Sequence, residues 1–178
     1  MHQEQLHFLY TTKGKFPESF KDCKVLEVGS CNVNGSIRYL FENCVYVGLD
    51  VGEGPCVDIV CSGHEYDAPD NSFDTVVSSE CFEHNPFWVE TFKNMHRVCR
   101  VGGRVILTCA TTGRPEHGTH VSNPQDSQLT IGVGWGDYYK NLTAMDFYEN
   151  IDVNSLFSSH EFFVNTNSHD LYFYGVKK

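Results

Sequence analysis

A short apolar run that ends in a glycine-containing turn constrains this chain more than any other feature. Residues 25–35 read Val-Leu-Glu-Val-Gly-Ser-Cys-Asn-Val-Asn-Gly, and apolar residues then recur at helical spacing at Ile37, Leu40 and Phe41. This pattern predicts a strand, a tight turn and a helix. Small residues at such a turn let a ligand approach the bare backbone N–H groups at the helix N-terminus. The segment is therefore typical of a nucleotide-binding turn.

A carboxylate follows at the end of the next predicted strand. Residues 45–49 form a second apolar run, and Asp50 follows it about 20 residues after Gly29. A doubly wound sheet places an acidic residue at this distance to accept both ribose hydroxyls, so adenosine is the implied ligand. The alternative is structural, with Gly29 in an ordinary turn and Asp50 as a helix cap.

The remaining periodic segments predict an α/β sheet that ends in a hairpin. Strands are expected at 56–61, 73–79, 104–110, 161–165 and 171–176. Pro86 is expected to start a helix with Asn85 as its cap, and the glycine pair 102–103 to end it. Other helices are expected at 3–10 and after Thr143.

Length and composition indicate one domain, residues 1–178, with 40% hydrophobic residues. The N-terminus lacks a signal-peptide pattern, and no apolar run is long enough to span a bilayer, so a cytoplasmic protein without membrane contact is expected. The formal net charge of −10 makes nucleic acid an unlikely partner and favours a neutral or cationic small molecule. The alternative is that the charge only maintains solubility. The oligomeric state is unknown from the sequence.

Two segments without clear periodicity are expected near the ligand. Residues 1–24 would form a helical segment that packs on the first strand or covers the ligand. Residues 111–142 are rich in Gly, His, Pro and Tyr. Long loops in compact domains are often functional covers, so this one is predicted to close over a substrate.

The cysteines and histidines do not form a recognisable metal motif. The eight cysteines include no C-x-x-C spacing and are expected to be buried, reduced thiols. Glu116, His117 and His120 lie close together in the long loop, but three such residues without a further ligand are weak evidence. No metal is therefore predicted.

Several of these segments, taken together, resemble the class I S-adenosylmethionine-dependent methyltransferases, in the small type 11 branch. The resemblance covers about residues 24–110 and rests on four segments in the family's order. They are 25–30 (Val-Leu-Glu-Val-Gly-Ser), 46–50 (Tyr-Val-Gly-Leu-Asp), 72–84 (Ser-Phe-Asp-Thr-Val-Val-Ser, then Phe-Glu-His) and 95–103 (Met-His-Arg-Val-Cys-Arg-Val-Gly-Gly). It implies a Rossmann-like, seven-stranded, mostly parallel sheet with an antiparallel last strand and helices on both faces.

The resemblance also implies that S-adenosyl-L-methionine is the cofactor. Glu27 and Gly29 with Ser30 would hold its methionine end, Asp50 its ribose and Val51 its adenine. Ser62 and Gly63 would add adenine contacts, and Ser79 and Glu80 would line the floor below the sulfonium. His64 is a further adenine candidate from its place at the strand end, although an exposed or capping histidine is the alternative. The family's turn commonly has glycine at the positions of Cys31 and Val33, so the path of this turn is open.

Methyl transfer needs orientation, exclusion of water and, for some acceptors, a base. His84 and His117 are the catalytic candidates, because imidazoles titrate near neutrality, although His84 could instead cap a helix. His120, Tyr138 and Tyr139 are the substrate candidates, and the tyrosines could instead anchor the loop.

The predicted function is methyl transfer from S-adenosylmethionine to a small molecule. A non-catalytic protein that binds this cofactor or S-adenosylhomocysteine is the first alternative. A protein or nucleic-acid methyltransferase is the second.

Overall fold

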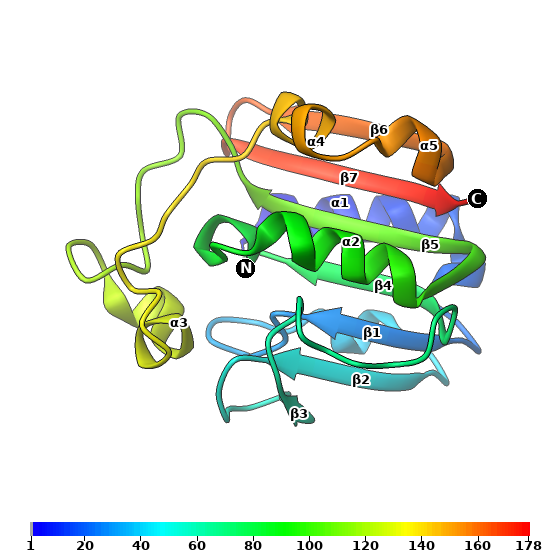
Figure 1. Cartoon of the computed structure of the whole chain (residues 1–178), viewed down its shortest axis with the longest axis horizontal. Coiled ribbons are helices and arrows are strands. Elements are labelled where there is room, and N and C mark those ends of the chain that lie inside the picture. Colours follow the sequence, from blue (N-terminus) through cyan, green and yellow to red (C-terminus); the bar gives the residue numbers. More distant parts are fainter. Residues whose placement is uncertain (1) are drawn as a thin grey trace.

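The apolar runs of the sequence form one seven-stranded sheet, shown in Figure 1 from the computed structural model, which describes residues 2–178. The strand order is β3-β2-β1-β4-β5-β7-β6. The strands are β1 (Lys24–Val28), β2 (Val45–Asp50), β3 (Ile59–Val60), β4 (Phe73–Ser79), β5 (Cys99–Ala110), β6 (Phe157–Asn165) and β7 (Asp170–Lys177). β1 to β5 pair in parallel, and β7 lies antiparallel between β5 and β6. The predicted sheet, with its antiparallel last strand, is confirmed.

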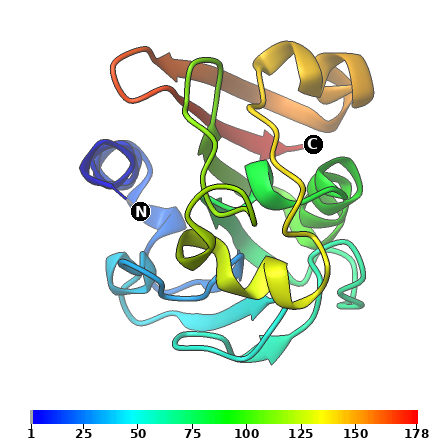
Figure 2. The same ribbon diagram turned by 90° about the vertical axis from the view of Figure 1, so that its left-hand side faces the viewer.

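Helices cover both faces of this sheet (Figure 2). They are α1 (Gln3–Lys15), α2 (Trp88–Val98), α3 (Gln128–Gly132), α4 (Ala144–Asn150) and α5 (Val153–Leu156). α1 lies on one face, and α2, α4 and α5 lie on the other. No helix within residues 2–178 is long and apolar enough to cross a membrane.

Alternation along the strands divides the core into two layers. In β1, Leu26 and Val28 point into the cluster formed with α2, whereas Val25 points into the cluster formed with α1. Phe92 and Phe147 fill the first cluster with edge-on aromatic contacts, their ring centroids 5.1 Å apart. The continuous apolar runs that identified these strands therefore place apolar side chains on both faces, as a covered sheet requires.

The helix predicted after the first turn is absent, and a single 3-10 turn, Arg38–Leu40, takes its place. Ile37, Leu40 and Phe41 are still buried, against the α1 layer. Asn32 explains part of the difference, because its side chain accepts a hydrogen bond from the Gly35 amide at 2.8 Å and closes a local turn. Asn and Gly residues favour such turns over a helix interior. The spacing of Ile37, Leu40 and Phe41 therefore reflects their burial and not the formation of a helix.

The helix expected from Pro86 begins two residues later, at Trp88, and Phe87 is its N-cap. Asn85 accepts a hydrogen bond from the Phe87 amide and donates one to the Thr91 hydroxyl, both at 2.8 Å. Its side chain therefore organises the approach to the helix without capping it. The helix also ends at Val98, before the glycine pair, because β5 already begins at Cys99.

Other boundaries differ less. The third strand is reduced to two residues, whereas α1 and the hairpin strands are longer than expected. The predicted cap at Thr143 is confirmed: its hydroxyl accepts from the Asp146 amide at 3.3 Å, and the Asp146 carboxylate accepts from the Thr143 amide at 2.8 Å.

Candidate active site

A cavity of about 400 Å³ opens at the carboxyl ends of β1, β2 and β4. The long loop 111–142 crosses this end of the sheet, and α3 within it lies in front of the strand ends (Figure 2). Ligands bind at this edge in open α/β sheets. The predicted cofactor residues that line the cavity are Glu27, Gly29, Ser30, Asp50, Ser79 and Glu80.

Gly29 shapes the turn where β1 meets the cavity. Its φ is +80°, and a Cβ built on it would lie 2.5 Å from the Cβ of Cys81. Only glycine fits both the backbone conformation and the close approach of Cys81. The turn therefore follows a path set by one glycine, without the further glycines common in the family.

Asp50 holds this turn against β2. One carboxylate oxygen accepts from the Cys31 amide at 2.9 Å, and the other accepts from the Val51 amide at 2.8 Å. Burial raises the pKa of this carboxyl above its usual range, although both backbone hydrogen bonds oppose the shift. Each oxygen keeps one lone pair for a ligand hydroxyl in the cavity.

Glu27 is a buried carboxyl in the middle of the site. The Tyr46 hydroxyl donates to it at 2.8 Å, and only 4% of the residue is exposed. Burial raises its pKa to about 8, so this group is mostly protonated at neutral pH. A cationic ligand group beside it would favour the ionised form.

A second, smaller hollow continues the cavity past Asp50. Val51, Ser62 and Gly63 line it, as does Trp135 from the long loop. His64 lies outside the lining of both hollows. Its ring stacks on Phe87 with centroids 4.2 Å apart, and its Nδ1 is 2.6 Å from the Ser62 hydroxyl.

The floor of the cavity contains an ion cluster that joins distant segments. Arg114 lies 3.2 Å from Asp170 and 3.6 Å from Glu80, and His2 lies 3.2 Å from the same Asp170 oxygen. Glu80 has a φ of +54°, which turns its carboxyl toward this cluster. Burial, followed by the charge of Glu83, raises the pKa of Glu80 to about 8. One oxygen of Glu80 is buried and has no hydrogen-bond partner.

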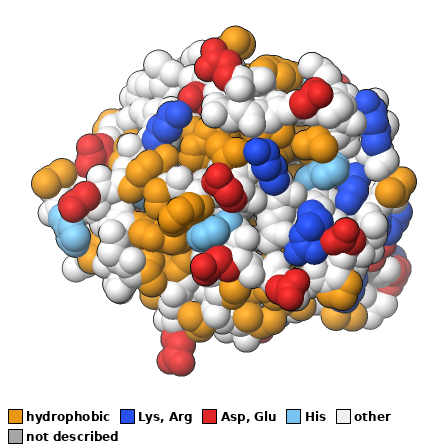
Figure 3. Space-filling model, viewed as in Figure 1, with side chains coloured by type: hydrophobic (Ala, Val, Ile, Leu, Met, Phe, Trp, Pro, Cys, Tyr) orange, Lys and Arg blue, Asp and Glu red, His pale blue; other side chains and the backbone are white. Residues whose placement is uncertain are grey.

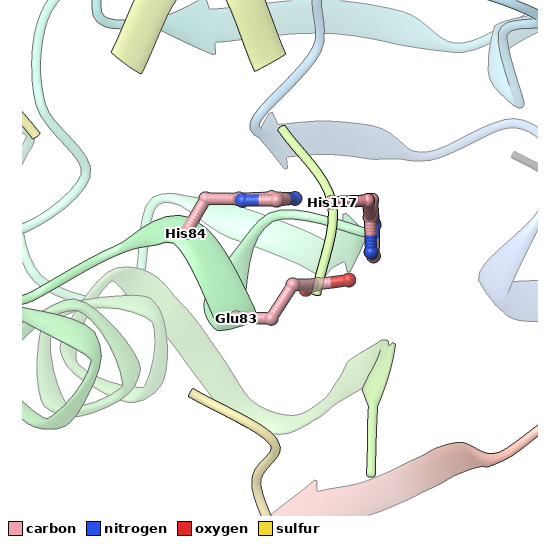
Figure 4. A group of neighbouring side chains, drawn as sticks. All are labelled: Glu83, His84 and His117. Atoms are coloured by element: carbon pink, nitrogen blue, oxygen red, sulfur yellow. The ribbon is translucent and has the colours of Figure 1, made fainter. Parts of the chain in front are cut away.

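Glu83, His84 and His117 form a second cluster beside this floor (Figure 4). The rings of His84 and His117 are perpendicular, with centroids 4.9 Å apart. Both histidines line the cavity, and Glu83 is fully buried behind them. Burial lowers the pKa of His84 to about 3, so its ring is neutral at neutral pH.

The predicted substrate residues lie outside the lining of either hollow. His120 pairs with Asp137 at 2.8 Å on an exposed part of the loop. Tyr138 packs against the core layer of α2. Tyr139 packs edge-on against His117, with centroids 5.1 Å apart, and its hydroxyl donates to the Pro115 carbonyl. Both tyrosines thus contact the protein's own framework.

Several lining residues had no signal in the sequence. They include His2, Cys81, Arg114, Gln128 and Thr130. Cys81 lies two residues after the end of β4, and this place near a strand end was the one available clue. His2 precedes α1, far from any strand end in sequence, and Arg114 lies four residues after the end of β5; no local pattern marks either residue. Around this end of the molecule the surface shows hydrophobic side chains interrupted by single charged and histidine side chains (Figure 3).

Comparisons with known proteins agree with the fold. Residues 26–107 match the family model described as a methyltransferase domain. No curated protein matches the chain. Among solved structures, the 1,6-didemethyltoxoflavin-N1-methyltransferase of Burkholderia thailandensis, with bound 1,6-didemethyltoxoflavin and S-adenosylhomocysteine, is similar. It has a TM-score of 0.60 and 13% identity, over 97% of this chain and 89% of that one.

Two further structures share the fold. A phosphoethanolamine N-methyltransferase of Haemonchus contortus, in complex with phosphomonomethylethanolamine and S-adenosylhomocysteine, has a TM-score of 0.62 at 16% identity, over 95% of this chain and 52% of that one. A protein from Pyrococcus horikoshii has a TM-score of 0.61 at 18% identity, over 99% of this chain and 92% of that one.

Residues 26–107 thus match a methyltransferase domain, and the strand order is the one that the resemblance to class I S-adenosylmethionine-dependent methyltransferases implied. The match lies within the segment on which the sequence resemblance rests. By the same resemblance, S-adenosylmethionine is the expected methyl donor.

Proposed function

We propose that this enzyme transfers the methyl group to a small molecule that is neutral or cationic. In this proposal the cavity has two halves. The cofactor half is formed by Glu27, Gly29, Asp50 and Ser79 at the strand ends, with Val51, Ser62 and Gly63 for the adenine. The acceptor half is formed by His84, Pro115, Glu116 and His117.

The charge of the cavity carries this proposal. Its lining includes five residues with carboxyl groups, Glu27, Asp50, Glu80, Glu116 and Asp126. With pKa values of about 8, Glu27 and Glu80 are mostly protonated at neutral pH, so they add hydrogen-bonding groups rather than negative charge until a cation lies beside them. Within residues 2–178, Arg114 is the only lysine or arginine that lines it, and Arg114 is already paired with Asp170. A polyphosphate backbone needs several uncommitted cations, so this lining disfavours nucleic acid. Small size and enclosure by the loop favour a compact acceptor.

In this reaction the cofactor supplies an activated methyl group, so the protein needs few catalytic groups. The acceptor's lone pair attacks the methyl carbon, the sulfur–carbon bond breaks with its electrons on sulfur, and a proton leaves the acceptor. Alignment of the two ligands and exclusion of water supply most of the rate. We assign alignment of the cofactor to the rigid strand ends. His84 and His117 face the acceptor, and we assign the handling of its proton to them.

Label transfer tests the acceptor class. The protein is incubated with S-adenosylmethionine labelled in the methyl group and with three fractions of one cell extract: metabolites below about 1 kDa, protein, and RNA. Label is expected in the metabolite fraction. Label in protein or RNA alone would overturn the proposal in favour of a macromolecular acceptor. Cofactor binding without label in any fraction would favour the non-catalytic alternative.

A further inference from the structure

Glu83, His84 and His117 place one metal-ligand atom each within 4.8 Å of the other two (Figure 4). We propose that these three side chains bind a divalent transition-metal ion of the zinc type in the acceptor half of the cavity. The sequence pointed to no metal, because its histidine cluster in the loop joined His117 to Glu116 and His120. In the fold those residues have other partners: Glu116 accepts a hydrogen bond from Thr119, and His120 pairs with Asp137.

Two of the three side chains offer buried atoms with no hydrogen-bond partner. One oxygen of Glu83, Oε2, and one ring nitrogen of His84, Nδ1, are both buried and unpaired. Glu83 has no exposed surface, and His84 is 4% exposed. An unpaired buried polar atom is costly and needs an explanation. A bound cation would satisfy both atoms at once.

Backbone groups hold the other ends of two of these side chains. The second oxygen of Glu83 accepts from the Ala110 amide at 3.2 Å. His117 Nδ1 lies 3.1 Å from the Pro115 carbonyl. A carbonyl can only accept, so Nδ1 carries the proton and the lone pair of Nε2 is free. Metal-binding histidines are held in this way, with one nitrogen on a carbonyl and the other on the ion.

The neighbouring cluster of His2, Glu80 and Asp170 also has ligand atoms within 4.8 Å of one another, but it already contains a cation. Arg114 lies 3.2 Å from Asp170, and the Ser168 and Tyr172 hydroxyls donate to the same carboxylate at 2.6 and 3.0 Å. No arginine or lysine pairs with Glu83 among the ion pairs of residues 2–178. Of these two clusters, the Glu83 cluster is therefore the one whose carboxylate has no positively charged partner in the part of the chain that the structure describes.

The ligand set selects the kind of ion. Two imidazoles and one carboxylate suit Zn²⁺, Fe²⁺ or Co²⁺, whereas Mg²⁺ and Ca²⁺ prefer oxygen ligands alone. Zinc bonds of about 2.0–2.2 Å bring ligand atoms to about 3–3.5 Å from one another, so the three side chains would draw together around the ion. Because His84 and His117 line the cavity, the open coordination position would face the acceptor.

A metal at this place would deepen the proposed function without depending on it. An acceptor hydroxyl or amine bound at the open position would lose its proton more easily, because the ion stabilises the resulting charge. The histidines would then act on the acceptor through the ion. The binding of the metal can be measured with neither cofactor nor acceptor present.

Titration of the chelator-treated full chain with Zn²⁺ alone tests the proposal, with Mg²⁺ as the comparison ion. One zinc per chain is expected, with no saturable Mg²⁺ binding at the same concentrations. Glu83→Gln and His117→Ala should each weaken zinc affinity by at least about 100-fold, since even indirect supports of a ligand change affinity by about 10–100-fold. His120→Ala and His7→Ala, which remove an exposed histidine each, should leave it unchanged.

X-ray absorption of the zinc-loaded protein separates this site from the cysteines. A shell of nitrogen and oxygen at about 2.0–2.1 Å is expected, whereas a sulfur shell at about 2.3 Å would overturn the proposal. Loss of zinc on His120→Ala would also overturn it in favour of the loop cluster. Thermal unfolding without metal shows that each variant folds. If Glu83→Gln does not fold, the zinc affinity of His117→Ala and the absorption spectrum still test whether zinc binds at this cluster. A protein that fails to bind zinc could still bind the cofactor, and a protein that fails to bind the cofactor could still bind zinc, so the two proposals fail separately.

Discussion

The half of the cavity that we assign to the cofactor consists of strand ends, whereas the half that we assign to the acceptor consists largely of one long loop. Glu27, Gly29 and Asp50 are fixed by the parallel ladder of β1 and β2, with backbone hydrogen bonds on both oxygens of Asp50. In the loop, His117 is fixed by its own neighbour Pro115 and by aromatic contacts. Rigid strand ends suit a constant cofactor, and a loop over them suits an acceptor that differs between enzymes.

Replacement of Gly29 is expected to have the largest effect on the cofactor half. Gly29→Ala puts a Cβ 2.5 Å from the Cys81 Cβ on a backbone with φ of +80°. We expect a loss of about 2–4 kcal/mol in the free energy of unfolding, measured by denaturant titration, and at least tenfold weaker binding of S-adenosylhomocysteine. Gly14→Ala is the matched control, because no atom lies within 4 Å of its added Cβ and alanine favours helix α1. Equal stability of the two variants would contradict the assigned turn.

Replacement of Asp50 separates the two halves. Asp50→Ala removes the carboxylate that faces the cavity and should weaken S-adenosylhomocysteine binding by about 30-fold, or about 2 kcal/mol. Asp74→Asn is the control: Asp74 also accepts a backbone amide, that of Lys24 at 2.7 Å, but at the opposite end of β1. The affinity of the Asp74→Asn variant for S-adenosylhomocysteine, measured by calorimetry, should match that of the unchanged protein. Unchanged affinity of Asp50→Ala would remove Asp50 from the site.

The buried Glu27 should couple cofactor binding to protons. Its pKa of about 8 leaves it protonated at pH 6.5, and a cofactor ammonium group beside it would ionise it. Calorimetry at pH 6.5 in buffers with different ionisation enthalpies should therefore show release of about one proton. Glu27→Gln should abolish this release. The same release in both proteins would assign the proton to another group.

The pH dependence of the free energy of unfolding provides a second test of the raised pKa of Glu27. The folded pKa of Glu27 lies above the ordinary value of 4.5, so its contribution to stability is full below about pH 4.5 and is lost as pH rises toward 8. The unchanged protein should therefore lose stability relative to Glu27→Gln between pH 5 and 8, measured by denaturant unfolding. A constant difference over this interval would contradict the raised pKa.

Replacement of His117 should have the smallest effect on the cofactor. His117→Ala is expected to change S-adenosylhomocysteine affinity by less than about threefold, while turnover falls by at least about 100-fold once an acceptor is known. Binding and initial rates, measured on the same preparation, check this. An equal loss in both quantities would mean that the two halves are not separable as described.

Most residues that the sequence predicted for the cofactor line the two hollows, whereas none of those predicted for the substrate does, and the difference has a physical reason. Strand ends are marked by local patterns, such as the apolar run before Gly29 or the carboxylate after residues 45–49, and the parallel sheet then brings them together. The prediction of a helix after Gly29 was wrong because Ile37 and Leu40 are buried at a spacing that is also typical of a helix.

The clusters in the acceptor half depend on contacts between distant segments. His2, Arg114 and Asp170 meet only through the insertion of β7 beside β5. Glu83 was part of a recognised motif, but its pairing with His117 depends on the path of the loop. Because no repeat or spacing encodes that path, the sequence grouped His117 only with its neighbours Glu116 and His120.

Calorimetric titration of the full chain with S-adenosylmethionine and S-adenosylhomocysteine, with NAD as the control, tests the central claim most directly. We expect one site per chain with a dissociation constant near the micromolar range, about −8 kcal/mol, for both ligands and no binding of NAD. Folded protein that binds neither ligand, or that binds NAD equally well, would contradict the assignment of this cavity to the methyl donor.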